Sequence, residues 1–171
     1  MKSSLHALSV EVIVNALDNL SWILEKAAEN ATQRKIDPAV LLGSRLAPDM
    51  LPLTRQIQIA SDIAKNSVAR LAGQEPPKFE DNETTIEALR ARIARTIDYL
   101  RGVPASALEG AETREVKVPL RDRTLTFKGL ELVQRWALPN VFFHATTAYA
   151  ILRHNGVDLG KRDFLNHGRE F

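Results

Sequence analysis

The sequence contains no cysteine among its 171 residues. That absence excludes disulfides, thiolate zinc sites, iron–sulfur clusters and cysteine nucleophiles. It also fits a reducing compartment, and we expect a cytoplasmic protein. Long uninterrupted apolar runs are missing too, because Glu11, Asn15 and Asp18 interrupt the apolar N-terminal stretch at helical spacing. The pattern predicts an amphipathic helix there, and neither a signal peptide nor a membrane span.

The sequence also has no large excess of charge of either sign, since the net charge is only +2. Neutralising nucleic-acid phosphates or a membrane surface requires a dense Lys/Arg stripe, so neither is predicted as a partner. The one concentration of arginine is interspersed with Glu87 and Asp98, and we interpret it as a solvated helix face; it comprises Arg90, Arg92, Arg95 and Arg101. HxxxH and HExxH motifs, glycine-rich phosphate loops and nucleophile elbows are also absent from the sequence.

What the sequence does contain is helical periodicity. Apolar residues recur at three- and four-residue steps and predict four long helices over about 4–33, 52–73, 84–102 and 129–154. Asp37 and Pro38 predict the start of a short helix, and Thr84 with Glu87 predicts a capping box. The alternating stretch EVKVPLRDRTLTF predicts a hairpin, and the tail from about residue 157 shows no periodicity.

These elements predict the fold class. We expect an all-α four-helix bundle with a small β-hairpin between the third and fourth helices. Residues 1–171 are expected to form one domain with an irregular tail. Trp136 and Phe143 lie seven residues apart beside the core stripe of the fourth helix, so this second apolar face needs a cover, either the hairpin or another subunit.

Candidate site residues are the polar groups on the inner helix faces. Asn140 and His144 occupy consecutive core positions of the fourth helix, and Asp49 and Gln56 lie seven apart on the second. One interpretation is a polar pocket between helices, with His144 as ligand, base or hydrogen-bond anchor. The other is a satisfied buried network, with Asn140 bonding carbonyls freed by Pro139 and His144 bonding Asp49 or Gln56. His154 is about 80° around the helix and ~15 Å from His144, so one metal cannot bind both.

The chain resembles a known family from Lys35 onward. The stretches KIDPAVLLGSRLAPDMLPLTRQIQIASDIAK, RLAGQEPP and ALPNVFFHATTAYAILRHNGVDLGKRDF are similar to an uncharacterised bacterial family in the DinB-like (YfiT-like) four-helix superfamily. The resemblance implies a bundle that often forms homodimers. In many members of the superfamily a divalent metal is held by three histidines, one on the second helix and an HxxxH pair on the fourth. Some members use it in thiol transfer or isomerisation.

Of these histidines only His144 fits the pattern, because the position four residues later is Ala148 and the second helix has none. Asp49 or Gln56 would have to substitute, which makes a poor zinc or nickel site. We therefore expect a dimeric bundle with a degenerate metal site and a polar pocket for a small molecule. The alternative is a divalent-metal-dependent thiol transferase, isomerase or hydrolase with His144 as a ligand.

Overall fold

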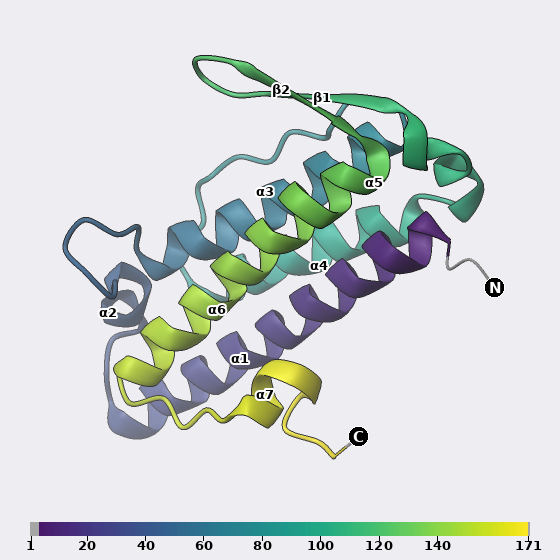
Figure 1. Ribbon diagram of the computed structural model, residues 1–171. Coiled ribbons are helices and arrows are strands. Elements are labelled where there is room, and N and C mark those ends of the chain that lie inside the picture. The colour runs from purple at the N-terminus through teal and green to yellow at the C-terminus, as the bar shows by residue number, and fades with distance from the viewer. Residues whose placement is uncertain (1–3, 171) are drawn as a thin grey trace.

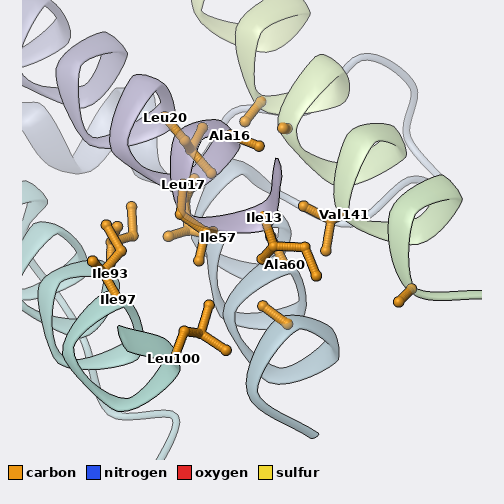
Figure 2. Close-up of a cluster of buried hydrophobic side chains, with 14 of the residues drawn as sticks. Ile13, Ala16, Leu17, Leu20, Ile57, Ala60, Ile93, Ile97, Leu100 and Val141 are labelled. Carbon is orange, nitrogen blue, oxygen red and sulfur yellow. The ribbon is translucent and has the colours of Figure 1, made fainter. Parts of the chain in front are cut away.

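The computed structural model describes residues 4–170 and consists of helices with one small hairpin (Figure 1). Four long helices lie side by side: α1 (Val12–Arg34), α3 (Leu53–Leu71), α4 (Ile86–Gly102) and α6 (Leu138–His154). Helices α1 and α3 each pack against both α4 and α6. A single apolar core fills the space between the four helices and includes Leu17, Ile57, Ile93 and Val141 (Figure 2). The expected helical fold with a hairpin is confirmed.

Short elements join the long helices. They are α2 (Pro38–Gly43), two 3-10 turns (Ala105–Leu108 and Ala111–Thr113), strands β1 (Glu115–Pro119) and β2 (Thr124–Lys128), and α5 (Gly129–Leu132). The Asp37 carboxylate accepts a hydrogen bond from the Ala39 amide at 2.9 Å, which is the predicted cap of α2. The predicted cap of α4 is displaced by one residue, because the hydroxyl of Thr85, not Thr84, accepts from the Ala88 amide at 3.1 Å.

The segment 73–85, which we call the strap, runs back alongside α3 before α4 begins (Figure 1). Late strap residues pair with the start of α3: Gln58 donates to Glu83 at 2.8 Å, and Arg55 pairs with Asp81. This return path makes α3 and α4 point in the same direction.

Arg92 anchors the strap and corrects the interpretation of the arginine cluster. Its side chain is completely buried and pairs with Asp62 at 2.8 Å, Asp81 at 3.0 Å and Glu83 at 2.9 Å. It also donates to the carbonyl of Glu80 at 2.9 Å. Burial alone would raise the pKa of Glu83, but hydrogen bonds from Gln58 and Arg92 lower it on balance. Arg92 therefore belongs to the interior, and only its neighbours on α4 form a solvated face.

The hairpin packs against α3 and α5. Val116 lies opposite Phe127 and Val118 opposite Leu125 in the antiparallel register, which matches the predicted alternation. The Phe127 ring lies 6.1 Å from that of Trp136, so the hairpin covers this residue. The turn after β2 requires Gly129, because a Cβ atom there would lie 1.9 Å from the Ala111 carbonyl oxygen.

The tail differs from the prediction of an irregular segment. Residues Lys161–Asn166 form α7, which packs on α1. The Asp163 carboxylate accepts hydrogen bonds from the Gly160 amide at 2.8 Å, from Lys26 at 3.0 Å and from Trp22 at 3.2 Å. Burial alone would raise the pKa of Asp163, and these bonds lower it on balance. A helix of six residues is too short to carry a periodic signal, which is why the sequence did not predict it.

Within residues 4–170, one helix is long and apolar enough to cross a membrane by length and composition alone. It is the continuous helix Ala7–Arg34, whose first turn, Ala7–Glu11, is π-helical. Half of its most apolar 18-residue stretch is buried inside the molecule. This burial is typical of the core helix of a compact protein, since an amphipathic helix buries one face against its neighbours.

Candidate functional site

His144 and Gln56 meet between α6 and α3. The Nδ1 atom of His144 lies 2.7 Å from Oε1 of Gln56. The amide of Gln56 is oriented by its own bond, in which Nε2 donates to the Leu51 carbonyl at 2.9 Å. An amide oxygen can only accept, so the imidazole carries its proton on Nδ1. The sequence placed both residues on inner faces, and the structure joins them directly.

The other imidazole nitrogen of His144 remains available. Nε2 makes no hydrogen bond with residues 4–170, and it is not among the buried atoms without a partner, so it reaches solvent. Burial lowers the pKa of His144 below its ordinary value, which keeps the imidazole neutral at physiological pH. A neutral imidazole with Nδ1 protonated presents a lone pair on Nε2. That atom can accept a hydrogen bond, take a proton or bind a metal.

Asn140 has a local role beside Pro139. The chain forms a π-helical turn over Val133–Ala137 just before this proline. The side-chain amide of Asn140 donates to the Trp136 carbonyl at 2.7 Å. Proline at position 139 cannot donate to the Arg135 carbonyl, and Asn140 instead bonds the next carbonyl along the chain. The side chain thus bonds the backbone of its own helix, as one of the two sequence interpretations proposed, but its acceptor is the Trp136 carbonyl and not the Arg135 carbonyl that loses its usual donor at Pro139.

Asp49 lies apart from the other candidates. It is exposed in the turn that precedes α3, and its side chain makes no hydrogen bond or ion pair with residues 4–170. The structure therefore joins Gln56 to His144, and links neither Asp49 nor Asn140 to that pair by any hydrogen bond. Seven residues separate Asp49 from Gln56, but the helix begins only at Leu53, so helical spacing does not apply to Asp49.

An apolar groove of about 430 Å³ lies on the outer side of α6, and His144 is connected to it through Phe143, which is one of the lining residues. It is lined by Leu46, Phe142, Phe143, Thr146, Thr147 and Ala150. The Phe143 ring stands edge-on to the His144 ring, with centroids 5.2 Å apart. Helical spacing of Phe142, Phe143, Thr146 and Ala150 could have revealed this stripe from the sequence. Leu46 comes from the loop before α3, and no periodicity predicts its position.

The donor set around His144 does not fit zinc or nickel. Among residues 4–170 no three His, Cys, Asp or Glu side chains come close enough together to hold a metal ion. Gln56 uses its oxygen for Nδ1 of His144, and Asn140 uses its amino group for the backbone. Catalytic zinc sites have three protein ligands, and here His144 is the single imidazole available.

Two comparisons match the chain to known proteins. The family described as "Domain of unknown function (DUF1993)" matches residues 5–165. A crystal structure of a DinB family member protein from Shewanella denitrificans superimposes with a TM-score of 0.89 at 45% sequence identity. The alignment covers 95% of this chain and 92% of that one. No curated protein matches the chain.

Proposed function

We propose, on the premise that the chain belongs to the DUF1993 family within the DinB-like fold, that it binds a small molecule beside His144. The observation that carries the proposal is the different environment of the two ring nitrogens of His144. Gln56 fixes Nδ1, and Nε2 is left facing solvent with its lone pair. A side chain held in this way is pre-organised to accept one hydrogen bond from a ligand.

The groove supplies the second half of the proposed site. Phe142 and Phe143 offer apolar surface, and Phe143 contacts the imidazole edge-on. Sites for small molecules combine a mostly apolar lining with a few fixed polar groups. The expected ligand therefore has an apolar or aromatic body and one hydrogen-bond donor directed at Nε2.

We further propose that the four long helices act as a DinB/YfiT-type four-helix bundle in a cytoplasmic homodimer. Val40, Leu46, Leu51, Phe142 and Phe143 are large apolar side chains left exposed, and Phe143 is 58% exposed. Leu46, Phe142 and Phe143 line the same groove, and exposed apolar side chains that lie together are typical of a subunit interface. A second subunit seated there would also cover the groove and exclude water from the ligand.

Phenol and anisole give a matched test of the proposed site. Both rings fit an apolar groove, but only phenol has a hydroxyl that can donate to Nε2. We expect phenol to shift the NMR signals of His144 and Phe143 saturably, with at least about fivefold higher affinity than anisole, because one hydrogen bond is worth roughly 1 kcal/mol. His144→Ala should remove the preference for phenol.

His154→Ala is the control, since His154 is exposed at the end of the same helix. Equal affinities for phenol and anisole, or shifts confined to other parts of the chain, would contradict the proposal. The metal-dependent enzyme remains the second candidate, because a histidine with Nδ1 fixed and Nε2 free also resembles a metal ligand. Elemental analysis of untagged protein separates the two: stoichiometric zinc or nickel would favour the enzyme, and sub-stoichiometric metal with no uptake on titration would exclude it.

A further inference from the structure

A second hollow lies away from His144, between the end of α3 and the strap. Its volume is about 550 Å³. It is lined on the α3 side by Lys65, Asn66 and Arg70, and on the strap side by residues 75–80. The polar residues on the α3 side are two cations and one amide.

Arg70 lines the hollow without a partner. Its guanidinium makes no hydrogen bond or ion pair with residues 4–170, although the side chain is half-buried. Burial lowers the pKa of Arg70, and the nearby charge of Glu75 only partly opposes that effect. A partly desolvated guanidinium without a carboxylate is unfavourable, and its fork of donors matches a carboxylate group.

Asn66 lies one helical turn before Arg70 and shares its face. Its Oδ1 accepts a hydrogen bond from the buried Nζ of Lys65 at 2.9 Å. This bond fixes the orientation of the amide, so the Nδ2 group of Asn66 is a donor with no partner among the described residues. Lys65 also bonds Asp62 at 3.0 Å, and its charge is therefore neutralised within the protein.

The strap side of the hollow combines apolar and charged residues: Pro76, Pro77 and Phe79 are apolar, and Glu75, Lys78 and Glu80 are charged. Pro76 and Pro77 have fixed φ angles, which limits the entropy lost on binding. The Phe79 ring is held by cations, with the Arg95 guanidinium 3.7 Å and the Lys65 ammonium 5.0 Å from its centroid.

We propose that this hollow binds a small organic molecule through a carboxylate held by Arg70 and Asn66. One half-buried guanidinium and one amide suit a monoanion, and the ammonium of Lys78 on the strap side is exposed to solvent. A phosphate dianion would need more donors and would be repelled more strongly by Glu75 and Glu80, which also border the hollow. Both glutamates are exposed, so solvent screens their effect on a single negative charge. Pro76, Pro77 and Phe79 offer apolar surface for the body of the ligand.

Benzoate and benzamide are matched probes for this site, because they share a shape and differ in charge. NMR titration of the full chain should show saturable benzoate shifts at Asn66, Arg70 and residues 75–80. Benzamide should bind at least about tenfold more weakly, since charge-assisted hydrogen bonds are roughly twice as strong as neutral ones. Arg70→Gln should abolish the benzoate shifts. Arg153→Gln removes an equal charge at an exposed position of α6 and should leave them unchanged.

Asn66→Asp gives a second variant that preserves the acceptor for Lys65 but replaces the donor by a carboxylate. It should also lose benzoate binding, and thermal melting verifies that each variant is folded. His144→Ala should bind benzoate normally, which separates this site from the proposed site at His144. Equal binding of benzamide, tighter binding of inorganic phosphate, an equal loss in Arg153→Gln, or no saturable benzoate shift would overturn the proposal.

Discussion

His144 combines two roles that the sequence presented as alternatives. A histidine on a core stripe is either a satisfied structural group or a functional one, and the sequence offers no way to choose. In the structure Nδ1 is bonded to Gln56 and Nε2 reaches solvent, so the proposed function gives the structural role to Nδ1 and the ligand-binding role to Nε2. Helical phase could predict that both residues face inward. It could not predict the tautomer, because that depends on the Leu51 carbonyl orienting the Gln56 amide.

Replacing His144 by leucine tests the structural role of its hydrogen bond with Gln56. The substitution leaves Oε1 of the buried Gln56 without its donor, and we expect a loss of about 1–3 kcal/mol in the free energy of unfolding. Urea denaturation measures this value. His154→Leu at the exposed end of the same helix should change stability by less than about 0.5 kcal/mol. If both variants were equally stable, the bond between Gln56 and His144 would have no structural importance.

The same pair of variants tests the pH dependence. The pKa of His144 is lowered in the folded state, so the unfolded chain binds a proton more readily than the folded one. The stability contributed by the neutral imidazole is complete above the unfolded pKa of about 6.5, and is lost as the pH falls through the folded value. Wild-type protein should lose stability on acidification in this range, and His144→Leu should lose less. An unchanged slope would contradict the lowered pKa.

At the scale of elements, the strap depends on one buried cation. Arg92 lies three residues after Leu89 and four before Thr96, and both of these are buried on the inner face of α4. Helical phase therefore could have placed Arg92 inside. The charges of its neighbours on α4 suggested a solvated face instead. Its partners could not be predicted, because Asp81 and Glu83 lie in an aperiodic segment whose path is not encoded by any regular pattern.

Arg92→Met should destabilise the protein strongly. Methionine matches the volume but leaves Asp62, Asp81 and Glu83 without their counter-charge, and breaking a buried ion pair costs about 3–5 kcal/mol. Partial exposure of Asp62 and Asp81 places the expected loss near the lower end. Arg90→Met is the matched control on the same helix, because its pair with Glu25 is solvent-exposed and worth less than about 1 kcal/mol. Similar chemical denaturation midpoints for the two variants would refute the anchoring role of Arg92.

At the scale of the whole molecule, the long amphipathic helices and the hairpin were predictable because their apolar periodicity extends over several turns. α7 and the course of the strap were not, since each is stabilised by single polar residues such as Asp163 and Arg92. For the second apolar face of the fourth helix, the sequence predicted that something must cover it, but not which part of the chain does so. The hairpin covers Trp136 through Phe127, and Phe143 remains 58% exposed.

The exposed Phe143 leads to a prediction about assembly. If a second subunit covers this surface, sedimentation equilibrium should show a dimer, and Phe143→Asp should yield monomers by placing a charge in the interface. Leu8→Asp is the control, because Leu8 is a comparably exposed apolar residue in the first turn of the N-terminal helix. A monomeric wild-type protein, or equal dissociation in both variants, would contradict the proposed dimer.

The anchoring of the strap has a consequence for the order in which the chain acquires structure. The contacts of Arg92 with Glu83 and Asp62 join residues 9 and 30 positions apart, whereas those of Asp163 with Lys26 and Trp22 join residues 137 and 141 apart. Closing a short loop costs less entropy than closing nearly the entire chain. During synthesis, α3, the strap and α4 can therefore assemble as soon as Gly102 has left the ribosome, and α7 is the last element to dock.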